Sequence, residues 1–278
     1  MSRIAYDPVK DRFADIIRRF RFLRTLFYMI LDLFFLRSWY VRAVLRKFGT
    51  PLDREGRWTL LDAGSGFGQY DRFILQQFDH VKIKAIDVKA DYLEDSQHYF
   101  QEDIAAGCIE FQQENLLHIN YDRDFNFAIC IDVLEHIEED VKVMTNIQHA
   151  LKEEGYFLMH SPSIFSEEDA DGDDSFVDEH ARAGYSKEDI KEKLKTAGFE
   201  PLHVAYTYGE KGHMAWKMLI KYPMLWLNRI KLWALPIMAV YYLFTLPVGL
   251  SLMWLDLNEP NVKGTGIYAL ARKRDTPK

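Results

Sequence analysis

The feature that most constrains this sequence is a glycine-rich segment directly after an apolar run. Leu60 and Leu61 lead into it, a helical pattern follows at 70–78, and the segment itself reads Asp62-Ala63-Gly64-Ser65-Gly66-Phe67-Gly68. Glycine allows a sharp turn and lets a ligand approach the backbone without meeting a Cβ. The pattern therefore predicts a buried strand, a ligand-binding turn and a helix, the opening unit of an α/β sheet.

Strand and helix patterns continue to alternate over residues 58–209. Short apolar runs predict strands at 59–61, 82–86, 109–113, 125–131, 156–160 and 202–208, and helical patterns lie between most of them, at 70–78, 90–105, 138–152 and 186–197. Such alternation predicts a parallel sheet with helices on both faces. One more strand is expected at 266–272, after an interruption by residues 210–262.

Polar side chains stand where successive predicted strands end. Asp62 and Asp87 end the first two strands, Asn115 follows the third, and Asp132 follows the fourth. In a doubly wound sheet these strand ends share one edge, where ligands bind. A dinucleotide fingerprint would need glycine at the sixth position of the turn, where this chain has Gln69. A carboxylate such as Asp62 also suits the cationic amino end of a ligand better than a pyrophosphate.

These motifs resemble those of class I S-adenosylmethionine (SAM)-dependent methyltransferases. The resemblance covers roughly residues 58–209 and 264–273, and it implies a Rossmann-like α/β fold. The implied sheet has seven strands and is mostly parallel, with an antiparallel last strand beside the fifth. The resemblance also implies SAM as the cofactor, with its ribose at Asp87 and its adenine at Asn115, where the family often carries aspartate. The expected cofactor-binding residues are Asp62, Gly64, Ser65, Gly66, Gly68, Asp87, Val88, Asn115, Leu116 and Asp132.

The acceptor is expected beside the loop 162–185, because the corresponding segment usually covers the acceptor pocket in the family that the sequence resembles. His180 is the candidate general base, since imidazole titrates near neutral pH, and Glu179 is the candidate to orient it. The alternative is that His180 only anchors the loop. The loop is acidic, but Asp174 stands where a calcium loop needs glycine, so no metal is expected.

The N-terminal part is basic and apolar. Residues 1–50 carry eleven Lys/Arg against four Asp/Glu, whereas the whole chain has a net charge of −7. Apolar spacing predicts a helix over 12–36, followed by a helix over 39–48 that Gly49 and Pro51 end. Early charges make a secretory signal unexpected. The two cysteines, Cys108 and Cys130, are expected to be free thiols in a reducing compartment.

Residues 232–255 carry no charge and are long enough to cross a bilayer as a helix. Pro236 and Pro247 are expected to divide this run. The strands before and after the insertion should be neighbours in one sheet, so both of its ends must lie on the same side and a single crossing is excluded. A membrane-dipping hairpin, an interfacial helical pair, or packing against a second subunit remain as alternatives.

The predicted organisation is N-terminal helices over 1–50, a SAM-binding core over 51–209, a hydrophobic helical insertion over 210–262, and a last strand and tail over 263–278. The predicted function is methyl transfer to a small lipophilic acceptor, with O-methylation favoured, by a peripheral or monotopic protein on the cytoplasmic face of the cell membrane. Two alternatives are an inactive SAM-binding partner protein and, disfavoured by Gln69, a nicotinamide-dependent oxidoreductase. A homodimer remains open, and nucleic acid is not expected as a partner because the body of the chain is acidic.

Overall fold

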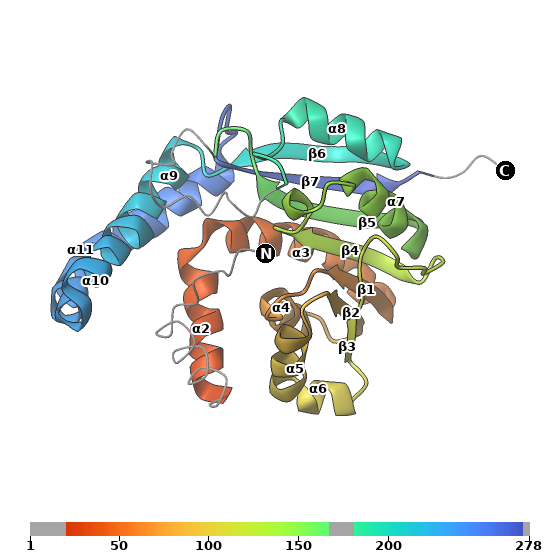
Figure 1. Ribbon diagram of the computed structural model, residues 1–278, viewed down its shortest axis with the longest axis horizontal. Coiled ribbons are helices and arrows are strands. Elements are labelled where there is room, and N and C mark those ends of the chain that lie inside the picture. Colours follow the sequence, from red (N-terminus) through yellow and green to blue (C-terminus); the bar gives the residue numbers. More distant parts are fainter. Residues whose placement is uncertain (1–20, 167–180, 275–278) are drawn as a thin grey trace, which may run out of the picture.

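A computed structural model describes residues 21–166 and 181–274. Its centre is a seven-stranded sheet in the order β3-β2-β1-β4-β5-β7-β6 (Figure 1). Strands β1 to β5 pair in parallel, whereas β7 is antiparallel to both β5 and β6. The predicted Rossmann-like sheet, with its antiparallel last strand beside the fifth, is confirmed. The strands are β1 (Trp58–Ala63), β2 (Val81–Asp87), β3 (Ile109–Gln113), β4 (Phe125–Ile131), β5 (Leu151–Pro162), β6 (Phe199–Thr207) and β7 (Gly266–Lys273).

Helices cover both faces of the sheet because successive strand side chains point to opposite sides. Leu60 belongs to the apolar cluster under one layer of helices, and its neighbour Leu61 belongs to the cluster under the other. The first layer holds α3 (Leu36–Glu55), α4 (Gln69–Gln77), α5 (Ala90–Tyr99) and α6 (Gln101–Ala105), and the second holds α7 (Asp140–Ala150) and α8 (Lys187–Thr196). The single helix predicted over 90–105 is wrong, since the chain breaks at Phe100 to bury that ring in the core.

Helix α3 runs through the residues that were expected to end it. It continues past Gly49 and Pro51 to Glu55, so the predicted stop is wrong. A Cβ at position 49 would lie 2.7 Å from Cζ of Phe78, so glycine serves close packing of α3 on the core. Tertiary packing has overridden the local propensity of these two residues.

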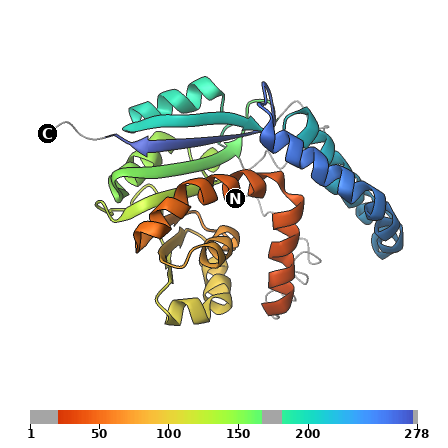
Figure 2. The same ribbon diagram turned by 180° about the vertical axis from the view of Figure 1, so that it is seen from behind.

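Residues 210–258, called the arm below, form an antiparallel helical pair that projects from the core (Figures 1 and 2). One leg contains α9 (Glu210–Trp216), the π-helix η4 (Lys217–Lys221) and α10 (Tyr222–Ile230), and the other is α11 (Ala234–Asn258), reached through η5 (Lys231–Trp233). Because the arm connects β6 to β7, the chain leaves and rejoins the core at the same edge of the sheet. The arm is therefore a hairpin.

Helix α11 is continuous through both prolines, so the expectation that they divide it is wrong. Pro236 lies in the first turn, where a missing N–H breaks no helical hydrogen bond. Pro247 is interior, and the helix is held there by its partner leg: a Cβ on Gly249 would lie 2.6 Å from Leu219, so the two legs pack closely. The base of the arm is fixed by Asp256, whose carboxylate accepts hydrogen bonds from Gly212 N at 3.0 Å and Tyr40 Oη at 2.7 Å.

Helix α2 (Arg21–Phe34) lies on the core with its polar side inward. Arg24 and Tyr28 are 5% and 0% exposed. Thr25 and Asp32 also contact the core, through Tyr99 and Gln69 respectively. The outward side consists of apolar residues that are 38–74% exposed: Phe22, Leu26, Met29, Ile30 and Leu33.

Candidate functional site

The glycine-rich turn joins the end of β1 to α4 and is bonded to the end of β2. Gly64 N and Ser65 N both donate to Ile86 O, at 2.8 and 3.0 Å. Gly64 has φ of +95°, and a Cβ there would lie 2.4 Å from Val133, so only glycine fits. Gly66 has φ of +51° and open space where a Cβ would be, which leaves the backbone accessible to a ligand.

Asp87 at the end of β2 faces this turn. Its Oδ2 accepts from Gly66 N and its Oδ1 from Lys89 N, both at 2.9 Å. These bonds hold the carboxylate at the edge of the sheet, and each oxygen retains a lone pair for a ligand hydroxyl. The neighbouring Val88 is 55% exposed, so its side chain is free to contact a ligand.

Asp62, at the same edge, is almost fully buried and its Oδ2 has no hydrogen-bond donor in the described part of the chain. Ser65 Oγ is likewise buried without a partner. Burial raises the pKa of Asp62 well above its usual range, and the nearby Asp71 and Asp87 raise it further. Asp71, in the first turn of α4, was overlooked in the sequence because it stands in a helical pattern outside the motif. Buried polar groups left unpaired at a ligand edge suit a polar ligand that supplies the missing partners.

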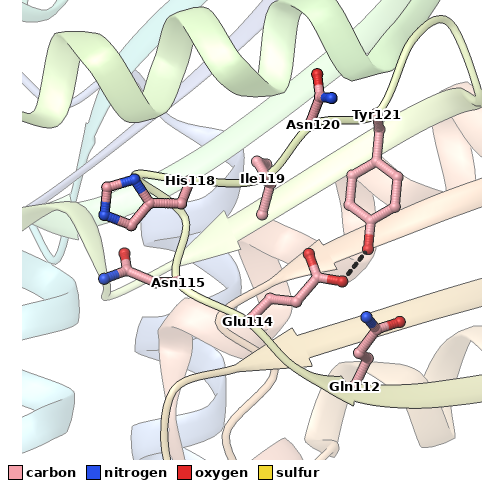
Figure 3. A pocket seen from close by; sticks show the side chains of 7 residues that line it. All are labelled: Gln112, Glu114, Asn115, His118, Ile119, Asn120 and Tyr121. Atoms are coloured by element: carbon pink, nitrogen blue, oxygen red, sulfur yellow. Dashed lines mark hydrogen bonds between the residues drawn. The ribbon is translucent and has the colours of Figure 1, made fainter.

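Asn115 and Leu116 lie just past β3, next to the turn between β3 and β4. Asn115 Oδ1 accepts from Leu117 N at 2.9 Å, and Leu116 is buried. A shallow pocket of about 380 Å³ adjoins Asn115, and Figure 3 shows the polar side chains around it. Its lining residues are Gln112, Glu114, Asn115, His118, Ile119, Asn120 and Tyr121. The wall is braced by a 2.7 Å hydrogen bond from Tyr121 to Glu114.

Asp132, at the end of β4, has φ of +54° and is bonded to α3 and β5, and through His160 to β6. Its Oδ1 lies 2.7 Å from Nδ1 of His160 in β5, and its Oδ2 forms an ion pair with Arg37 of α3. His160 Nε2 lies 3.1 Å from Thr207 Oγ1 at the end of β6. Burial, assisted by the charge of Arg37, lowers the pKa of His160 well below its usual value. His160 is therefore neutral, and both of its ring nitrogens are occupied by protein groups.

Arg37, His160 and Thr207 were not found from the sequence. They come from a helix and two strands that are distant along the chain, and none belongs to a recognisable motif. Asp132, by contrast, was expected at the cofactor, and the structure engages both its oxygens with protein partners.

His180 and Glu179, the expected base and its orienting partner, lie outside the described residues. Immediately after them, Ala181 N donates to Glu135 O at 2.8 Å, close to the end of β4. The Glu135 carboxyl is buried, which raises its pKa, and it accepts a 2.7 Å hydrogen bond from Ser161 Oγ. No cluster of three or more metal-ligating side chains occurs within residues 21–166 and 181–274.

Helix α2 closes one side of the glycine-rich turn. Arg24 donates to Phe67 O at 3.0 Å and to Asp95 O at 2.8 Å, and Tyr28 Oη also donates to Phe67 O. The guanidinium of Arg24 is buried in hydrogen bonds with the turn and with α5, so it is not available to an anionic lipid surface. Arg21 pairs with Glu102 of α6, and both of these side chains are at least half exposed.

The comparisons with known proteins agree with this geometry. Residues 55–201 match the family model described as "Methyltransferase domain". A putative sarcosine dimethylglycine methyltransferase from Galdieria sulphuraria has a similar structure, with a TM-score of 0.58, 17% identity, and coverage of 86% of this chain and 87% of that one. An S-adenosylmethionine-dependent methyltransferase from Clostridium acetobutylicum has a TM-score of 0.56 at 13% identity, covering 91% of this chain and 99% of that one.

A third similar structure is phosphoethanolamine N-methyltransferase 2 from Haemonchus contortus in complex with S-adenosyl-L-methionine. Its TM-score is 0.58 at 18% identity, with 84% of this chain and 52% of that chain covered. At these identities the structural likeness shows a shared fold. No curated protein matches this chain by sequence.

Proposed function

The chain belongs to the methyltransferase-domain family, and from this premise we propose that it transfers a methyl group from SAM to a lipophilic acceptor at the cytoplasmic face of a membrane. The cofactor and the reaction class follow from the family. The acceptor class rests on one observation, the outward apolar surface of α11.

The residues at the sheet edge fit the cofactor. Asp62 and Ser65 carry buried unpaired oxygens beside a turn whose backbone at Gly66 is open, which suits the polar amino-acid end of SAM. We assign Asp87 to the ribose hydroxyls and Asn115 to adenine, because both stand at this edge with oxygens that can accept further hydrogen bonds. When bound, SAM supplies an electrophilic methyl group on a sulfonium. The protein's own contribution is to hold the acceptor in line with that methyl, since positioning alone supplies much of the rate in such a displacement.

For an oxygen acceptor, a base must remove the hydroxyl proton. His160 is unsuited, because both ring nitrogens are engaged and its pKa is lowered. We assign the base to His180, with Glu179 orienting it. The support is the hydrogen bond from Ala181 N to Glu135 O, which brings the residue after His180 to the end of β4.

The outward side of helix α11 is apolar and exposed to solvent. The helix is long and apolar enough to cross a bilayer, and only 6% of its most apolar 18-residue stretch is buried. No charge interrupts residues 232–255. The side chains more than half exposed are Leu235, Ile237, Val240, Leu243, Phe244, Val248 and Trp254, with Trp233 at the tip 83% exposed. An apolar surface of this extent marks contact with a membrane or another protein.

Two further features favour a membrane. Lysine and arginine lie on the other leg of the arm and at its tip, at Lys217, Lys221, Arg229 and Lys231. Near anionic lipid each such charge contributes about 1 kcal/mol. The apolar side of α2 also faces outward, with five apolar residues exposed. The arm and α2 approach each other where the rings of Phe34 and Tyr242 lie 5.5 Å apart.

Vesicle co-sedimentation tests this proposal. The full-length protein is expected to bind vesicles containing phosphatidylglycerol more strongly than vesicles of phosphatidylcholine alone, and salt should weaken the binding without abolishing it. The matched variant replaces residues 222–240 with a short Gly/Ser linker. This keeps the base of the arm intact, including Asp256 and the Tyr241 and Tyr242 hydroxyls that bond to the carbonyls of Met218 and Leu219.

The variant should bind S-adenosylhomocysteine (SAH) normally and bind vesicles much more weakly than the full-length protein, because it loses the tip of the arm with Leu235, Ile237, Val240 and Trp233. If the full-length protein instead ignores vesicles and runs as a detergent-free dimer, the apolar surface is a subunit interface and the proposed lipophilic acceptor loses its basis.

A further inference from the structure

Two buried carboxyl groups face each other behind the glycine-rich turn. Asp62 ends β1 and is 2% exposed, and Asp71 lies in the first turn of α4 and is 0% exposed. The two carboxyl groups lie close enough to each other to share a hydrogen bond. Asp71 also touches the turn itself, because its Oδ2 would lie 3.3 Å from a Cβ on Gly68.

Within the described residues, no cationic side chain pairs with these two carboxyls. Apart from each other, neither oxygen of Asp71 nor Oδ2 of Asp62 has a hydrogen-bond partner in that part of the chain. The charged group that acts on Asp62 besides Asp71 is Asp87, another acid. The other titratable groups near the pair, Tyr28 on α2 and Cys130 on β4, have raised pKa values and are neutral at pH 7.

Two carboxyl groups can share a hydrogen bond only if one of them keeps its proton, because ionised carboxyl oxygens only accept. Two buried negative charges side by side without a cation or a donor are also costly, so the burial of this pair favours a state that holds at least one proton. Burial supports this, since it raises the pKa of Asp71 to about 7 and that of Asp62 well above its usual range. The start of α4 favours negative charge there, but it has not offset the cost of burial.

We propose that Asp62 and Asp71 form a proton-sharing pair that receives the cationic amino end of the cofactor and releases a proton to solvent when that end binds. The inference rests on the proposed use of SAM at this edge. The incoming ammonium supplies the positive charge that the pair lacks, so it favours the ionised form and the proton leaves. Asp71 acts as a positioning residue, because it does not touch the cofactor itself but raises the pKa of Asp62.

The sign of the pH dependence follows from linkage. Binding that releases a proton becomes tighter as pH rises and weaker as pH falls, by at most tenfold per pH unit for one proton. In Asp71→Asn the amide donates a hydrogen bond to Asp62 and carries no charge, so the two contributions of Asp71 that raise the pKa of Asp62 are lost, whereas burial and Asp87 remain. Asp62 should therefore hold its proton less tightly than in wild type, and cofactor binding should release a smaller fraction of a proton.

Calorimetry with SAH tests the proposal in two buffers of different ionisation enthalpy, phosphate and Tris, at pH 6, 7 and 8. For wild type we expect release of about half to one proton near pH 7 and affinity about 10- to 100-fold higher at pH 8 than at pH 6. Asp71→Asn should release less of a proton than wild type and show a shallower pH profile. Asp79→Asn, an exposed aspartate just before β2, is the matched control and should behave as wild type. Any proton exchanged by the amine of SAH itself is the same for all three proteins, so the difference in proton release between them reports on the pair.

Equal proton release by wild type and Asp71→Asn would overturn the pair while leaving the cofactor assignment intact. Failure of wild type to bind SAH would overturn the cofactor assignment itself. An infrared difference spectrum of wild type provides a test that needs no variant. SAH should remove a protonated-carboxyl band, and an unchanged band would contradict the proposal.

Discussion

The edge of the sheet and the outer helices distribute polar and apolar groups in opposite ways. At the edge, Asp62, Asp87 and Asp132 are held by neighbouring strands above the two apolar clusters of the core. In α2 and the arm the arrangement is reversed: α2 turns Arg24 and Tyr28 inward, and apolar side chains face outward on both elements. The core buries its own apolar surface, whereas the outer helices leave theirs exposed.

Helix α2 belongs to both regions. Its inner side holds the carbonyl of Phe67 in the glycine-rich turn, and its outer side carries the exposed apolar residues. Under the proposed function, three activities can be measured independently: methyl transfer, cofactor binding and membrane binding. A variant that changes one of them and leaves the other two unchanged supports the division between the sheet edge and the outer helices, and a variant that changes two together contradicts it.

The largest effect is expected on chemistry. His180→Ala should lower methyl transfer by about 10²- to 10⁴-fold if His180 is the general base. The measurement is transfer of labelled methyl from SAM into the organic phase of a lipid extract from cells that make the protein. SAH affinity and vesicle binding should stay as in wild type. Turnover within a few-fold of wild type would return His180 to anchoring the loop and would favour an acceptor that needs no base.

An intermediate effect is expected on cofactor binding. Asp87→Ala should weaken SAH binding by about 1–3 kcal/mol, or about 5- to 150-fold, since ribose hydroxyls would lose a charged acceptor. It also removes the acceptor for Gly66 N, so the turn should loosen. Vesicle binding should not change. Asp79→Ala, at the opposite edge of the sheet, is the control, and equal affinities of the two variants would show that the cofactor lies elsewhere.

The sequence predicted the cofactor edge better than any other part of the molecule. The glycine-rich turn and the strand-end residues Asp62, Asp87 and Asn115 form contiguous motifs whose spacing is set by local structure, so their shared edge followed from the topology. Strands β3 and β4 were predicted to the residue, because short apolar runs with sharp polar boundaries define them.

What the sequence did not predict depends on contacts between distant segments. The ion pair of Arg37 with Asp132 joins residues 95 positions apart, and no local sequence pattern predicts it. Gly49 and Pro247 looked like helix breaks, yet close packing against Phe78 and between the legs of the arm keeps both helices intact. The orientation of α2 was also hidden, because a helix that is apolar on most sides does not reveal which side faces the core.

The smallest effect tests whether the outer side of α2 contacts lipid. Leu26 on α2 and Leu202 on β6 are matched, since they are 42% and 41% exposed. Burying a whole leucine side chain is worth about 1.5–3 kcal/mol, so moving the exposed part of Leu26 into lipid should contribute about 1 kcal/mol. Leu26→Ser is therefore expected to weaken vesicle binding about fivefold, whereas Leu202→Ser, on the sheet away from α2 and the arm, should leave it unchanged. SAH affinity should be kept in both variants, because Leu26 lies on the exposed side of α2, whereas Arg24 and Tyr28 on its buried side hold the Phe67 carbonyl.

Equal vesicle binding by the two variants would show that α2 does not contact lipid and that the arm alone makes the contact. A change in oligomeric state with Leu26→Ser would instead identify the outer side of α2 as a protein interface.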